Sequence, residues 1–93
     1  MFEKFKEAGL KPKHLEKFLK VSRTTASIWY NGHGGPHHLI MYKVKPFLKA
    51  VEAALAAGEF PVPKQYKAAA ANTYVHATLR KHIIAQKTQK ADN

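Results

Sequence analysis

Cysteine is absent from this sequence of 93 residues, and long apolar runs are absent as well. Without cysteine, the chain can form neither a disulfide framework nor a thiolate metal site. No apolar run approaches the roughly 18 residues that a membrane span needs. The first residues, MFEKFKEAGL, carry charges where a signal peptide needs an apolar stretch. We therefore expect a soluble, intracellular protein.

Acidic residues are few, and their scarcity argues against an enzyme. The chain has six, and its only aspartate, Asp92, lies in the polar tail, whereas general acid–base catalysis needs placed carboxylates. The neighbouring histidines His33, His37 and His38 have no Cys, Asp or Glu beside them and form a weak metal site. The glycines among them lack the lysine and hydroxyl of a nucleotide-binding loop. We expect no catalytic residue, metal, cofactor or small-molecule ligand.

Positive charge is what the sequence has in excess. Sixteen lysines and arginines against six acids give a formal net charge of +10. No acid falls between Lys17 and Val51, and none falls between Phe60 and Ala91. Acid-free stretches of this length project a positive field suited to phosphates. The alternative is a basic surface that only keeps the protein soluble.

Apolar periodicity and turn residues predict an all-α fold. A short first helix around Phe5 closes at Gly9, where a left-handed residue costs least. A second helix runs from Pro12 to Lys20. Ser22 is a good cap for a third helix, which Asn31-Gly32 ends.

The second half of the chain is expected to contain three more helices. Leu39–Leu55 has helical periodicity, but Pro46 marks a kink or a helix start, and we favour two helices over roughly 37–43 and 45–57. A stiff, extended connector rich in proline follows, and then an alanine-rich helix with a polar tail. The predicted organisation is a five-helix domain over 1–59, the connector over 60–63, and the C-terminal helix and tail over 64–93.

A short helix, a tight turn and a second helix opened by a small polar residue form the helix-turn-helix plan, in which the second helix enters the major groove of DNA. Residues 10–32, LKPKHLEKFLKVSRTTASIWYNG, fit this plan. They resemble the Cro and lambda-repressor-like family: Leu15 and Leu19 fall where that family packs its first helix, and Val21-Ser22-Arg23 matches its turn and recognition-helix entry. The family usually has a glycine where Lys20 stands. The resemblance implies a small phage-type repressor.

The expected recognition helix has two sides. At about 100° per residue, Ala26 and Trp29 point one way, and with Leu15, Leu19 and Val21 they form the expected core around the motif. The side chains on the opposite arc are expected to contact bases, and they are Arg23, Thr24, Ser27, Ile28 and Asn31. For Ile28, packing in the core is the alternative.

Phosphate contacts are expected around this helix, where lysines and histidines accompany a glycine-rich segment whose backbone amides can approach DNA closely. The candidates are Lys20, Ser22, His33, Gly34, Gly35, His37, His38, Lys43 and Lys45. Ser22 also has the ordinary alternative of serving only as the helix cap.

A chain of this size buries a modest share of its surface, so a second copy of itself is an expected partner. The candidate dimerisation face lies on the final helix and comprises Tyr66, Ala70, Val75, Leu79 and Ile83. The alternative is that this helix covers its own domain. The alanines and the central Asn72-Thr73 make only a weak apolar face for lying on a membrane.

We therefore expect a cytoplasmic homodimer, in a bacterium or a phage-infected cell, that binds a pseudo-palindromic operator in double-stranded DNA. The expected activity is transcriptional regulation, specifically repression. One alternative is an antitoxin or excision-type accessory factor, which binds DNA and another protein. The other is a helical module that binds protein or RNA.

Overall fold

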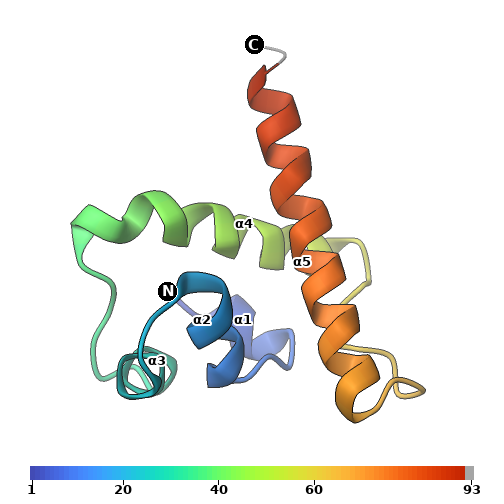
Figure 1. Cartoon of the computed structure of the whole chain (residues 1–93), viewed down its shortest axis with the longest axis horizontal. Coiled ribbons are helices and arrows are strands. Elements are labelled where there is room, and N and C mark those ends of the chain that lie inside the picture. The colour runs from blue at the N-terminus through green and yellow to red at the C-terminus, as the bar shows by residue number, and fades with distance from the viewer. Residues whose placement is uncertain (92–93) are drawn as a thin grey trace.

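The computed structural model describes residues 1–91, and over that range it contains helices and no strand. Five α-helices and a 3-10 turn follow one another (Figure 1): α1 (Glu3–Glu7), α2 (Pro12–Leu19), α3 (Arg23–Tyr30), η1 (His38–Ile40), α4 (Met41–Ala56) and α5 (Ala68–Ala91). The predicted all-α class is confirmed. Within the described range, no helix combines the length and the apolarity that crossing a membrane requires. Asp92 and the end of the predicted polar tail lie outside the described residues.

Local sequence signals explain where the first three helices begin and end. Gly9 takes a φ of 74° directly after α1, Pro12 begins α2, and Ser22 caps α3. Lys20 ends α2 in the left-handed conformation, with φ 54° and ψ 48°, at the position where the resemblance leads us to expect glycine. A residue with a Cβ in this conformation costs roughly 1–2 kcal/mol. The tight turn between α2 and α3 therefore forms despite backbone strain at Lys20.

α4 differs from the prediction because it is one helix rather than two. The helices expected over 37–43 and 45–57 are replaced by η1 and one continuous helix with Pro46 inside it. A proline in a helix interior costs roughly 3 kcal/mol. However, Val44, Phe47 and Val51 are all buried on one side of α4, and burying each is worth roughly 1.5–3 kcal/mol. The free energy gained by burying these side chains outweighs the cost of placing Pro46 inside the helix.

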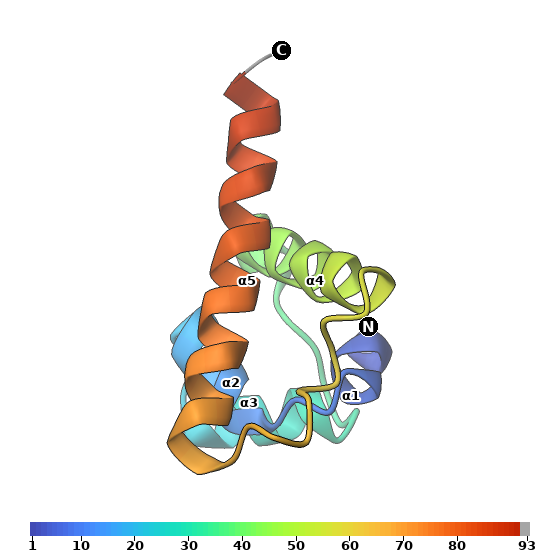
Figure 2. The ribbon, with the colours of Figure 1, turned by 90° about the vertical axis from the view of Figure 1, so that its right-hand side faces the viewer.

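One core joins the helices. α4 packs against α1, α2 and α5, and α2 packs against α3. In Figures 1 and 2, α5 crosses α4 and its C-terminal part extends beyond it. The largest fully buried side chains are Phe5, Leu10, Leu15, Leu19, Val44, Phe47, Val51 and Leu79. The core therefore takes side chains both from the predicted domain over 1–59 and from the segment over 64–93.

α5 packs on its own chain, which corrects the predicted dimerisation face. Val75 and Leu79 are buried in the core, where α5 packs against α4, and Ile83 packs at the edge of that core. Tyr66 precedes α5, and Ala70 is exposed. These residues therefore do not form one exposed face. The alternative, in which the final helix covers its own domain, describes the structure.

The connector is anchored at its start and leads into α5, which packs on the core. Phe60 is buried, and the Tyr74 hydroxyl donates a hydrogen bond of 2.7 Å to the Glu59 carbonyl oxygen. The Glu59 carboxylate pairs with Lys81 and His82 of α5. Two hydrogen bonds hold the pKa of Glu59 below its ordinary value, and the one from Lys81 has a larger effect than the one with His82.

We expect Leu79→Ala to lower the free energy of unfolding by about 2–5 kcal/mol, because truncating a fully buried leucine leaves a cavity. The matched control is Arg80→Ala, an exposed neighbour, which should change that free energy by less than about 0.5 kcal/mol. Urea denaturation followed by circular dichroism measures both. A Leu79→Ala protein as stable as the control, but converted from dimer to monomer, would show that α5 pairs two copies instead.

Candidate nucleic-acid interface

α3 begins at a serine that closes its first turn. The Ser22 Oγ accepts a hydrogen bond of 3.1 Å from the Thr25 backbone N–H, and the Ser22 hydroxyl donates one of 2.9 Å to the Thr25 Oγ1. Ser22 therefore serves as the helix cap. Because its hydroxyl proton is engaged in this turn, the Ser22 backbone N–H is the group left to meet a phosphate.

α3 has a buried side and an exposed side. Ala26 is fully buried, and Trp29 is only 7% exposed. The residues predicted to contact bases all lie at exposed positions, and they are Arg23, Thr24, Ser27, Ile28 and Asn31. Ile28 is 40% exposed, so the structure places it on the surface rather than in the core. The division of side chains around α3 is thus the one that the helical periodicity predicts.

Asn31 folds back at the C-terminal end of α3. Its Nδ2 donates a hydrogen bond of 2.9 Å to the Ser27 carbonyl oxygen and one of 3.3 Å to the Ser27 Oγ. A base contact through the Asn31 Nδ2 therefore requires these bonds to be exchanged. The sequence did not reveal this cap, because an asparagine that ends a helix can equally well point outward.

Two lysines that the sequence analysis did not single out lie beside the exposed side of α3. Lys11 and Lys13, at the start of α2, line the same hollow as Arg23 and Ser27. Glu16 lines it as well, so three cationic side chains accompany one carboxylate. This hollow results from the packing of α2 against α3, which local periodicity does not show.

Most of the predicted phosphate contacts lie at exposed positions, namely Lys20, Ser22, His33, Gly34, Gly35, His37, His38 and Lys45. His37 also has a local task, because its Nδ1 accepts a hydrogen bond of 3.2 Å from the Leu39 backbone N–H and caps η1. Lys43 differs from the others: it is half-buried, and its Nζ donates a hydrogen bond of 2.8 Å to the Leu19 carbonyl oxygen. That bond satisfies a carbonyl at the end of α2. Lys43 therefore has a structural role, and the phosphate contact predicted for it stays a prediction.

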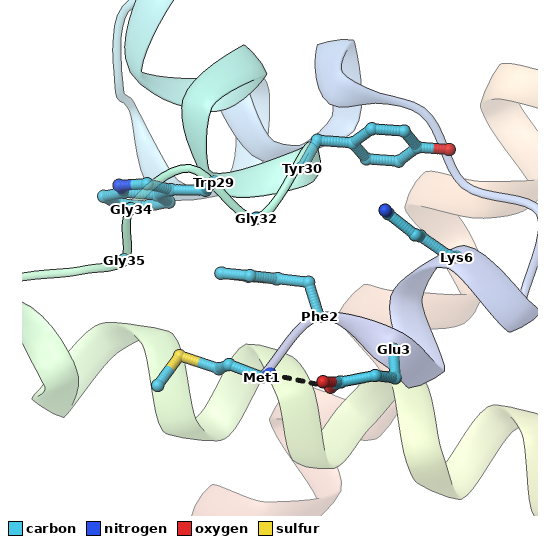
Figure 3. Close-up of a pocket in the computed structure, with 9 residues that line it drawn as sticks. All are labelled: Met1, Phe2, Glu3, Lys6, Trp29, Tyr30, Gly32, Gly34 and Gly35. Atoms are coloured by element: carbon cyan, nitrogen blue, oxygen red, sulfur yellow. Dashed lines mark ion pairs between the residues drawn. The ribbon is translucent and has the colours of Figure 1, made fainter.

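Trp29 has an aromatic partner from the N-terminal segment. Its ring is stacked on that of Phe2, with centroids 5.9 Å apart and planes 12° from parallel. Figure 3 shows the two rings, with Gly34 and Gly35 running past the indole. These residues line an open pocket of about 410 Å³. The sequence predicts a core of Trp29 with Leu15, Leu19 and Val21, but it does not reveal Phe2, which is distant along the chain.

A second polar cluster lies between α2 and α5. The rings of His14 and His76 have centroids 6.5 Å apart, and His76 is stacked on Phe18 at 4.8 Å. Burial lowers the pKa of His14, and the nearby charge of Lys13 lowers it further. Burial likewise lowers the pKa of His76, and the nearby charge of Lys17 adds to this effect. Both rings are therefore neutral at neutral pH.

Comparisons with protein-family models, with curated proteins and with solved structures give no match. Among the described residues, no group of three or more His, Cys, Asp or Glu side chains is placed to hold a metal ion. The arrangement offers hydrogen-bond donors and positive charge around the exposed side of α3.

We expect Trp29→Ala to cost roughly 3–5 kcal/mol of unfolding free energy, because a large buried ring is lost. Phe2→Ala should be coupled to it by about 0.5–1.5 kcal/mol, since stacked aromatic pairs stabilise each other beyond the area they bury. A double-mutant cycle in urea measures the coupling, and strict additivity would argue against the stack. A Trp29→Ala protein that kept its stability and lost only DNA affinity would place Ile28 in the core instead.

We expect the fold to lose stability as the pH falls below about 6.5. In the unfolded chain His14 and His76 titrate near that value, whereas their pKa values in the folded chain are lower. The unfolded state therefore binds protons first, and stability falls as the pH decreases. Lys13 and Lys17 face these rings and no carboxylate lines their cleft, so nothing there compensates the new charges.

Urea midpoints between about pH 8 and pH 5 measure this loss. The control is the double variant His14→Gln/His76→Gln, which cannot titrate at these positions and should have a flatter profile. Identical profiles for the wild type and the double variant would contradict the expectation.

Proposed function

We propose that the chain binds double-stranded DNA sequence-specifically, with α3 in the major groove, and that it regulates transcription as a repressor. The observation that carries this proposal is the two-sided α3, which anchors Ala26 and Trp29 in the core and leaves the opposite side chains exposed. The major groove admits one α-helix, and its base edges offer hydrogen-bond acceptors, donors and thymine methyl groups. The exposed side of α3 has the matching groups.

The individual side chains suit direct readout of bases. Arg23 can donate two hydrogen bonds to O6 and N7 of guanine, and Ile28 can contact a thymine methyl. Thr24 and Ser27 can bond either base edges or phosphates. Because residues 18–50 contain no acid, the surface around α3 attracts the backbone of DNA. Lys20 and Lys45, both exposed, would neutralise phosphates there.

A single α3 offers too few side chains to single out one genomic site. We therefore propose that two copies bind one pseudo-palindromic operator, with their α3 helices about 34–36 Å apart. The surface that pairs them would exclude Val75 and Leu79, which are buried in the chain's own core. Repression would follow from occupation of the operator. The resemblance of residues 10–32 to the Cro and lambda-repressor-like family supports this proposal.

We expect Arg23→Ala to weaken binding to the preferred duplex by about 1–3 kcal/mol and to relax the preference at one base pair. The matched control is Lys45→Ala, which should weaken preferred and random duplexes alike, because a lysine near a phosphate carries no sequence information. Selection of bound sequences from a random duplex pool, followed by titration of both variants, measures these effects.

Equal losses on every duplex after Arg23→Ala would make Arg23 a phosphate contact. Indifference of the wild-type chain to duplex DNA, or binding to RNA alone, would refute the proposed function and favour a helical interaction module.

A further inference from the structure

The cleft between α2 and α5 has cationic walls. It has a volume of about 360 Å³, and its lining residues are Lys13, His14, Lys17, Asn72, Thr73 and His76. None of these carries a carboxylate. Lys13 and Lys17 are one helical turn apart, so their ammonium groups extend from the same side of α2. The cleft therefore has the charge of an anion site.

His14 brings an unused hydrogen-bond donor to this cleft. Its Nδ1 accepts a hydrogen bond of 3.0 Å from the Lys11 backbone N–H, so the neutral ring carries its proton on Nε2. His14 is buried, with only 6% of the residue exposed, and among the described residues no hydrogen bond of good geometry reaches Nε2. A buried donor without an acceptor is energetically unfavourable, so a ligand or side chain that satisfies it is stabilised.

Asn72 of α5 lines the same cleft as His14. Its side chain is close enough to interact with the His14 ring and to oppose the lowering of the His14 pKa that burial causes, although no hydrogen bond of good geometry reaches Nε2. An asparagine amide has an acceptor on one side and two donors on the other. An Asn72 amide whose Oδ1 faces the His14 Nε2–H can present Nδ2 to a ligand in the cleft.

The cleft is continuous with the surface beside α3. Lys13 lines both the cleft and the hollow that contains Arg23 and Ser27. Figures 1 and 2 show the N-terminal part of α5 beside α2, at the same end of the molecule as α3. The sugar–phosphate backbone of a DNA duplex that passes Arg23 can therefore continue over Lys13 toward α5.

We propose that this α2–α5 cleft binds a phosphate group, and that in the complex with DNA this phosphate belongs to the backbone flanking the base pairs under α3. Lys13 and Lys17 supply the charge, and Asn72, oriented by His14, donates a hydrogen bond to a phosphate oxygen. His76 supplies one further N–H. The Thr73 hydroxyl already donates to the Ala69 carbonyl oxygen at 3.0 Å, so Thr73 forms part of the wall. The assignment to DNA rests on the proposed function, whereas the phosphate site does not.

The first experiment tests the phosphate site without DNA. Inorganic phosphate is titrated into the full chain, and the ring resonances of His14 and His76 are followed by NMR. Saturable shifts of both rings are expected in the wild type. Asn72→Asp, which keeps the size of the side chain but places a negative charge beside the ligand, should abolish them. Its melting temperature shows whether the variant is folded.

The second experiment tests the backbone of the duplex. Phosphates flanking the preferred site are replaced one at a time by neutral methylphosphonates. At one flanking position the wild type should lose affinity, and Lys13→Ala/Lys17→Ala should be insensitive to that replacement. The slope of log affinity against log salt should become shallower by about 2 in this variant, because two phosphate contacts are lost. The matched control is Lys49→Ala/Lys64→Ala, which removes the same charge at exposed positions outside the cleft.

The outcomes separate the two proposals. Duplex binding with equal slopes for the two double variants, and no phosphate shifts in the wild type, would overturn the cleft proposal and leave the proposed function standing. Saturable phosphate shifts without any effect of methylphosphonates would overturn the assignment to DNA, since the cleft would then bind a free phosphate. If the wild type binds no duplex, the proposed function fails, and the phosphate titration alone decides the site.

Discussion

The buried side of α4 is the surface on which the other helices are assembled. Val44, Phe47, Ala50, Val51 and Ala54 lie along it, and α1, α2 and α5 pack against α4 directly. α3 is positioned indirectly, because it packs mainly against α2. The bond from Lys43 of α4 to the carbonyl end of α2 therefore bears on the position of α3 as well. We therefore expect a change that shifts α4 to act on the exposed side of α3 through α2.

Local patterns predicted a large part of this arrangement, because helix starts, helix ends and buried stripes are set by neighbours in sequence. Ser22 as a cap and Gly9 as a helix end follow from single residues and their intrinsic preferences. The exposed side of α3 follows from the period of the helix. Even Lys20, which departs from the expected glycine, occupies the left-handed position that the turn requires.

Contacts between distant segments account for what the patterns could not predict. Pro46 was read as a helix boundary, because the local penalty of proline is visible in the sequence while the packing that offsets it is not. The stiff connector expected from its prolines does not show where α5 packs, because the pairing of Glu59 with Lys81 and His82 joins residues far apart in the chain. The same holds for the stacking of Phe2 on Trp29 and for the α2–α5 cleft, which brings Asn72 and His76 to the same site as His14.

The order of contacts along the chain has a consequence for biosynthesis. The side chain of Gln86 donates to the Pro46 carbonyl oxygen across 40 positions of sequence, and Val75 and Leu79 cover a core whose other members have been synthesised earlier. During translation the apolar side of α4 therefore leaves the ribosome well before α5 can cover it. Until then the nascent chain exposes that surface to chaperones and to other copies of itself.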